Sequence, residues 1–147
     1  MTKWKLSIAS GLGLFAILFA LIYARSGRSA VAKHFGSPVP SSVRDVRYQS
    51  DEWLGFMPEP SYFLRFTASP EDILTLLQRN GFSAVAMDTY FIPSTAGPSP
   101  GAPAWWKFDA PAADIQCYAR TSSKPCVIEW LWWDRTSGRV YYRLSCP

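Results

Sequence analysis

Three cysteines and one histidine are the residues of this chain with the clearest capacity for nucleophilic or metal chemistry. Cys117, Cys126 and Cys146 lack the close CxxC spacing of a zinc site. The lone histidine, His34, lies in a predicted linker ahead of the domain, so no histidine is expected beside a Ser or Cys nucleophile. The sequence also contains no GxGxxG or GxxxxGKS/T phosphate loop. We therefore predict no catalytic triad, no metal site and no bound cofactor.

Paired carboxylates are the remaining route to catalysis, because two acidic side chains at a suitable separation can act as the acid and base of a glycosidase. Glu129 is the strongest candidate, since it lies in a tryptophan-rich stretch where loss of water would raise its pKa. The simpler interpretation pairs Glu129 with Arg143 across two strands. We favour that interpretation and predict a protein that is not an enzyme. A small hydrolase that uses Glu129 is an alternative.

The cysteines suit a structural role in the last predicted hairpin. A loop of residues 134–138 places Cys126 opposite Cys146 and predicts a disulfide between them. Cys117 is then the unpaired thiol, because three cysteines cannot all pair within one chain. A four-residue loop would shift the pairing by one residue and remove this arrangement, so both registers stay open at this point.

The tryptophans are the most unusual feature of the composition. Two pairs are adjacent in sequence, and neighbours on a strand point to opposite faces, so rings are expected on both sides of a sheet. A single helix covers one face only; the other face needs the Pro-rich residues 93–104 and residues 53–56, or stays exposed. Core packing is the simpler interpretation. The functional interpretation is a binding surface, for which the candidate residues are Trp105, Trp106, Trp133 and Tyr141.

The elements that must position these side chains indicate a small α+β domain. A helix is predicted from its signals: Ser69 caps it, Pro70 takes the first position, and Gly81 ends it. Its apolar stripe is expected to contain Ile73, Leu74 and Leu77. Strands are predicted at residues 44–49, 62–67, 115–120, 126–134 and 139–146. This order predicts a small antiparallel β-sheet with one main helix packed on one face.

An uncharged stretch of nineteen residues, 6–24, precedes this domain and is long enough to span a bilayer as a helix. Basic residues flank the stretch on both sides. We predict a transmembrane anchor over residues 1–25, a stalk over 26–42 and an aromatic-rich domain over 43–147. The competing interpretation is a signal peptide cleaved after Ala32, where small residues alternate.

Orientation follows from two opposing signals. More basic residues follow the apolar stretch than precede it, which favours a cytoplasmic domain. Against this, the short N-terminal tail is easily left in the cytoplasm, and the cysteines favour an oxidising compartment for the domain. We therefore predict a single-pass protein with its domain outside the cytoplasm, in the periplasm if the cell is bacterial. Small residues recur along one side of the stretch, so a homodimer through this helix is an alternative to ordinary membrane-helix composition.

Charge excludes one large class of function. Residues 1–40 hold five basic and no acidic residues, whereas the remainder holds ten basic and eleven acidic residues. The domain thus has a net charge of −1 and no excess with which to bind nucleic acid. The leading hypothesis is a membrane-tethered, non-enzymatic interaction module of the cell envelope that binds another envelope or exported protein. The alternative is a cell-wall glycan-binding domain that uses exposed tryptophans.

Overall fold

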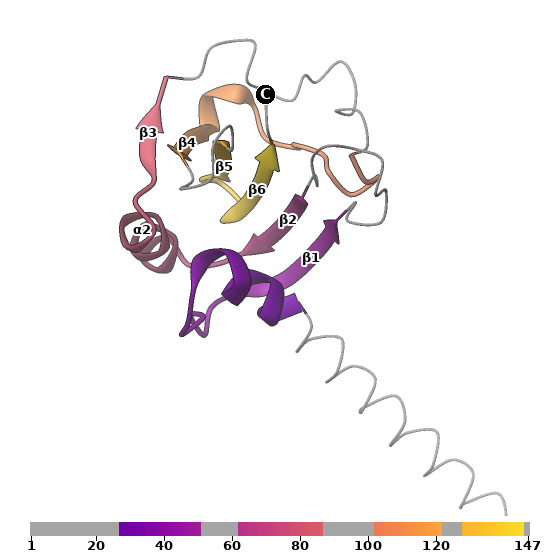
Figure 1. Cartoon of the computed structure of the whole chain (residues 1–147). Helices are drawn as coiled ribbons and strands as arrows, with labels where there is room; N and C mark the ends of the chain where they lie inside the picture. Colours follow the sequence, from indigo (N-terminus) through magenta and orange to yellow (C-terminus); the bar gives the residue numbers. More distant parts are fainter. Residues whose placement is uncertain (1–26, 51–61, 87–101, 122–127, 146–147) are drawn as a thin grey trace, which may run out of the picture.

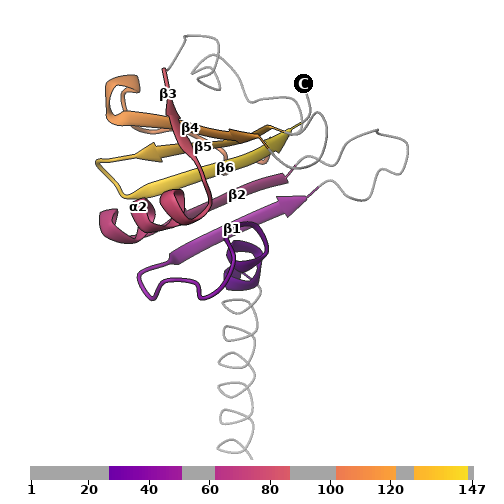
Figure 2. The same cartoon turned by 60° about the vertical axis from the view of Figure 1, so that its left-hand side comes forward.

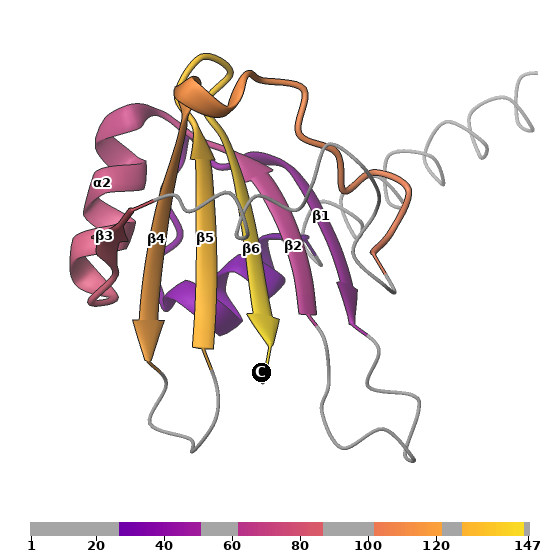
Figure 3. The same ribbon diagram turned by 90° about the horizontal axis from the view of Figure 1, so that it is seen from above.

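The computed structural model describes residues 27–50, 62–86, 102–121 and 128–145. They form one six-stranded antiparallel sheet with the strand order β1-β2-β6-β5-β4-β3 (Figures 1 and 3). The domain is therefore α+β, as predicted. Its elements are β1 (Arg44–Ser50), β2 (Tyr62–Thr67), α2 (Pro70–Arg79), β3 (Ser83–Val85), the 3-10 turn η1 (Ala112–Asp114), β4 (Ile115–Thr121), β5 (Ile128–Asp134) and β6 (Arg139–Ser145).

Local signals define both ends of α2, as the sequence predicts. The Ser69 hydroxyl accepts a hydrogen bond from the Asp72 N–H at 3.3 Å, which satisfies one of the free amides of the first turn. At the other end Gly81 takes a φ of 68°, and the Phe82 N–H donates to the Leu77 carbonyl at 3.0 Å. This is a Schellman-type stop, which glycine permits because it has no Cβ.

The buried side of α2 differs by one residue from the expected stripe. Ile73, Leu76 and Leu77 face the core, whereas Leu74 is 52% exposed. Residues 27–35 form a second helix on the same side of the sheet (Figure 2). The domain therefore has two helices on one face, where the sequence analysis expected one.

The second helix lies in the interval that the sequence analysis assigned to a stalk. Ala30, Val31 and Phe35 are buried in the same core as α2. The guanidinium of Arg28 donates to the carbonyls of three later residues, Val39, Pro40 and Val43, at 2.9–3.0 Å. Packing on the sheet thus stabilises residues 27–35 as a helix beyond what local propensity supplies.

The two faces of the sheet have separate cores. On the helix face, inward side chains of β2, β5 and β6 pack against α2 and residues 27–35. On the loop face, the opposite side chains of β2, β4, β5 and β6 are covered by residues 102–110. In Figure 3 the segment 102–114 crosses in front of the sheet and the helix of residues 27–35 lies behind it. Both faces are thus buried over much of their area.

The predicted register of the last hairpin is wrong. Asp134 pairs with Arg139, and Glu129 lies opposite Leu144 rather than Arg143. A four-residue turn causes this shift, because the Asp134 carboxylate accepts the N–H groups of Thr136 at 2.9 Å and of Ser137 at 3.1 Å.

Several predictions fall on parts of the chain that the structure does not describe. Cys126 and Cys146, whose disulfide depended on that register, lie outside the described residues. Cys117 is a buried free thiol, as predicted. Within the described ranges no helix has the length and apolar character needed to cross a membrane. The predicted anchor, with its dimer seam, and residues 53–56 are likewise outside them.

Candidate functional site

The four predicted binding residues lie on both faces of the sheet. Trp133 is 5% exposed in the helix-face core. Trp106 and Tyr141 are 4% and 1% exposed in the loop-face core, with ring centroids 5.4 Å apart. Trp105 is half-buried beside Trp106, at a centroid distance of 6.1 Å. The structure thus brings three of the residues together, and only Trp105 has a partly exposed ring.

Trp106 closes the loop-face core. Its ring stands edge-on to Phe63 at 5.0 Å and to Trp132 at 6.2 Å, which is a favoured arrangement for aromatic pairs. The Tyr141 hydroxyl donates to the Lys107 carbonyl and so holds the covering segment on β6. Residues 102–110 form this cover and leave Trp105 at its margin, next to β1 and β2.

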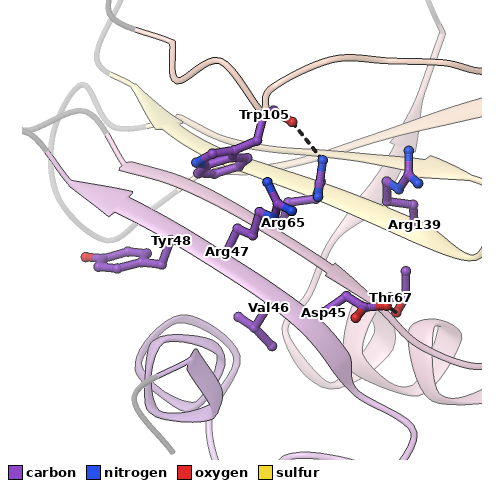
Figure 4. Close-up of a pocket in the computed structure, with 8 residues that line it drawn as sticks. All are labelled: Asp45, Val46, Arg47, Tyr48, Arg65, Thr67, Trp105 and Arg139. Atoms are coloured by element: carbon purple, nitrogen blue, oxygen red, sulfur yellow. Dashed lines mark hydrogen bonds between the residues drawn. The ribbon is translucent and has the colours of Figure 1, made fainter. Parts of the chain in front are cut away.

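A pocket of about 650 Å³ lies at that margin (Figure 4). Its lining includes Trp105 and the three arginines Arg47, Arg65 and Arg139, which come from β1, β2 and β6. Among the described residues, Asp45 contributes the only carboxylate to the lining. The pocket is therefore basic, although the domain as a whole carries a net charge of −1.

Arg65 is the arginine at the centre of this arrangement. Its Nη1 donates to the Trp105 carbonyl at 2.8 Å, and its guanidinium carbon lies 5.7 Å from the centre of the Trp105 ring. Arg65 pairs directly with Arg47 across the β1–β2 ladder. Burial lowers the pKa of Arg65, and the positive charges of Arg47 and Arg139 lower it further.

The other charged groups are positioned by neighbours. Arg139 donates to the Asp109 carboxylate at 2.8 Å and to the Tyr141 hydroxyl at 3.4 Å, and its pKa is raised chiefly by the bond to that hydroxyl. Asp45 has a φ of 52° at an irregularity in β1, and its carboxylate accepts from the Thr67 hydroxyl at 3.3 Å. Within the described ranges no hydrogen bond or ion pair engages the guanidinium of Arg47, which is exposed.

Glu129 lies on the opposite, helix face, where it is 6% exposed. Its Oε2 accepts from the Tyr142 hydroxyl and from Arg120 Nη2, both at 2.6 Å. Arg120 also donates to the His34 carbonyl at 3.1 Å, and His34 Nδ1 lies 3.3 Å from the Tyr142 oxygen. His34 thus packs against the sheet instead of lying apart from the domain, as the sequence analysis expected.

This second cluster is built as a structural network. Burial, followed by the hydrogen bond to Glu129, raises the pKa of Tyr142, so the hydroxyl stays protonated and donates. The carboxylate of Glu129 is occupied by two strong donors in a buried position. It is not placed to act as an acid or base on a ligand in the pocket of the other face. Among the residues described, no three His, Cys, Asp or Glu side chains group as metal ligands.

Sequence reasoning missed the arginines of the pocket. Arg47 and Arg65 both occupy predicted strands, and an arginine in a strand is ordinarily interpreted as a solvent-exposed residue. They become partners only because β1 and β2 pair antiparallel with a bulge between Arg44 and Arg47. Neither the pairing nor the bulge can be read from the residue types.

Comparisons of the chain with protein-family models, with curated proteins and with solved structures found no match.

Proposed function

We propose that this protein is a non-enzymatic, membrane-tethered interaction module that binds another envelope or exported protein through the pocket beside Trp105. The observation that carries the proposal is the pocket's lining of three arginines and a partly exposed tryptophan. Arginine, tryptophan and tyrosine are enriched among the few residues that contribute most of the binding energy at protein interfaces. Tyr48 borders the pocket as part of β1, but its ring points to the helix face, where it packs against His34 and Tyr62 at centroid distances of 6.1 and 6.3 Å.

The acids of the described residues support binding rather than catalysis. Asp45, the only carboxylate of the lining, has no acidic partner there, so no acid–base pair flanks the cavity. Glu129 is bonded to Arg120 and Tyr142 on the other face of the sheet. These positions argue against the small hydrolase.

The tether rests on the uncharged residues 6–24 and their basic flanks. Gly27 lies against Val46 of β1, since a Cβ built on Gly27 would be 3.0 Å from the Val46 Cβ. An anchor that ends before Gly27 would thus enter the domain next to the strand that lines the pocket. A partner close to the bilayer, on the periplasmic side of a bacterial membrane, fits this arrangement.

Site-directed photo-crosslinking in the native membrane tests the proposal. A photoreactive aromatic amino acid is placed at Trp105, whose half-buried ring borders the pocket, or at Leu74, which is 52% exposed on α2 on the opposite face of the sheet. We expect one reproducible adduct with a single envelope protein from position 105 and none from position 74. Detergent extraction with no reproducible adduct, or the same adducts from both positions, would contradict the proposal.

The half-buried ring of Trp105 favours glycan binding as the second candidate, because a tryptophan face can stack on a sugar. Sedimentation of the full chain with insoluble cell wall distinguishes the two. Trp105→Ala should keep the thermal stability near that of the parent, since the ring is partly exposed, whereas Trp133→Ala removes a core ring and lowers it. Wall binding that vanishes in Trp105→Ala, without any protein adduct, would favour the glycan-binding function.

A further inference from the structure

We propose that the pocket takes the carboxylate side chains of an acidic segment of the partner polypeptide, held between Arg47 and Arg65. This inference rests on the proposed function and names the chemistry of the bound segment. It follows from three observations: the direct pairing of two arginines, the lack of a partner for Arg47 among the described residues, and the place of the pocket at the edge of the sheet.

The pairing of the arginines is unfavourable without a ligand. Like charges directly opposite each other on neighbouring strands repel, and such pairs destabilise a sheet. Arg65 and Arg47 stand in this relation, and among the described residues neither guanidinium forms a hydrogen bond or ion pair with a carboxylate. The third arginine, Arg139, is already bonded to Asp109. In the part of the chain that the structure describes, two cations that face one pocket therefore have no ion-pair partner.

A carboxylate fits that position chemically. Guanidinium groups donate paired N–H bonds that match the two oxygens of a carboxylate. Arg65 is held by the Trp105 carbonyl, so its side chain is already ordered and loses little freedom when an anion binds. Arg47 is exposed and can turn toward the same anion. The two side chains thus provide one fixed and one adjustable donor.

The surroundings favour an acidic peptide over a phosphate-bearing ligand. A cavity of about 650 Å³ is within the range of about 300–1,000 Å³ typical of ligand sites, and it exceeds a single small oxyanion. The ring of Trp105 offers apolar area to side chains that flank a carboxylate. β1 is an edge strand of the sheet described here, so an extended segment can lie along it. The net charge of −1 outside residues 1–40 disfavours a long polyanion such as nucleic acid.

Fluorescence anisotropy with the full chain in zwitterionic detergent tests this inference. The probe is a labelled Glu-rich peptide, and its control is the same peptide with Gln at every Glu. We expect binding of the Glu peptide only, weakened by added salt, and weakened about tenfold in Arg47→Gln through loss of a charge-assisted hydrogen bond. Arg44→Gln is the matched control, because it removes the same charge from an exposed position on β1 outside the pocket lining.

A second variant tests whether a folding defect could explain the loss of peptide binding. Arg65→Lys keeps the charge but loses the paired donors, so it should weaken binding of the Glu peptide while circular dichroism stays unchanged. Equal binding of the Glu and Gln peptides, or equal effects of Arg44→Gln and Arg47→Gln, would overturn the inference. So would Arg47-dependent binding to anionic but not zwitterionic vesicles in place of the peptide, which would identify a lipid headgroup.

The failure of this inference is distinguishable from failure of the proposed function. If the adduct at position 105 persists in Arg47→Gln and the Glu peptide does not bind, the partner is held by other contacts and only the acidic-segment inference is wrong. If the Glu peptide binds with the expected dependence on Arg47 but no adduct forms at position 105, the acidic-segment inference is supported and the envelope-protein partner is not. Competition by inorganic phosphate equal to that by free glutamate would contradict the preference for carboxylates.

Discussion

Glu129 shows how one buried carboxylate joins distant parts of this domain. It accepts hydrogen bonds from Tyr142 on β6 and Arg120 on β4, and Arg120 extends the link to the carbonyl of His34 in the helix of residues 27–35. Hydrogen bonds to an ionised group are stronger than those between neutral groups. Glu129, the strongest catalytic candidate in the sequence, therefore links separate elements of the fold through buried hydrogen bonds.

Glu129→Ala should lower the free energy of unfolding by about 3–5 kcal/mol, because it leaves a buried ion pair without one partner. The hydroxyl of Tyr142 would lose its acceptor at the same time. Urea denaturation measures the change. Glu71→Ala, at an exposed position in the first turn of α2, is the control and should lower the free energy by no more than about 1 kcal/mol. Equal losses in the two variants would refute the structural role of Glu129.

Burial raises the pKa of the Cys117 thiol from 9.0 to about 11. A group with a higher pKa in the folded state favours folding only while it is protonated. Its contribution is therefore complete below pH 9 and is lost as the pH rises toward 11. We expect the unfolding free energy of the parent to fall more steeply over this interval than that of Cys117→Ala. Parallel pH profiles from urea denaturation would contradict this expectation.

At the scale of the elements, short turns decide the geometry of the sheet. The Asp134 side chain organises the four-residue turn between β5 and β6, and this turn sets the register that brings Arg139 opposite Asp134. The turn also contacts the entry to α2, because the Ala68 N–H donates to the Gly138 carbonyl at 3.1 Å. One tight turn thus places both a pocket arginine and the start of a helix.

Two glycines with nearly equal backbone angles allow strain to be separated from contact. Gly81 and Gly138 have φ values of 68° and 67°, but a Cβ on Gly138 would lie 2.9 Å from the Ala68 carbonyl oxygen, whereas one on Gly81 meets nothing within 4 Å. Gly81→Ala should lower the unfolding free energy by about 1–2 kcal/mol through backbone strain alone. Gly138→Ala should lower it further. Urea denaturation of both variants tests this order, and equal values would show that the turn relaxes freely.

At the scale of the whole molecule, the domain is a sheet covered by helices on one face and by residues 102–110 on the other. The helix of residues 27–35 completes the first cover, with Val31 and Phe35 no more than 1% exposed. Arg79 and Asn80 of the α2 end both donate to the Phe35 carbonyl, at 2.7 and 3.1 Å. The segment next to the predicted anchor is therefore part of the core.

Removal of residues 1–40 should abolish cooperative folding, because the remaining chain exposes the apolar surface that residues 27–35 cover. A fragment that begins at residue 27 should fold with a sharp thermal transition. Near-ultraviolet circular dichroism and thermal melts compare the two fragments. If the fragment from residue 41 melts like the longer one, the contribution of this helix to stability has been overstated.

The sequence alone determined those features whose signals are local. Ser69, Pro70 and Gly81 act within a few residues of themselves, so the limits of α2 follow from residue types and spacing. Alternating apolar residues likewise predicted β2 and the meander of β4, β5 and β6, and therefore the α+β class.

Only the tertiary structure decided the features that depend on contacts between distant residues. The helix of residues 27–35 forms against a sheet that the later chain supplies, and the register of β5 with β6 depends on bonds to one aspartate. Arg47 and Arg65 line the same pocket because β1 and β2 pair with a bulge. The energies of such pairings belong to the assembled sheet and not to any segment, which is why residue patterns alone do not reveal them.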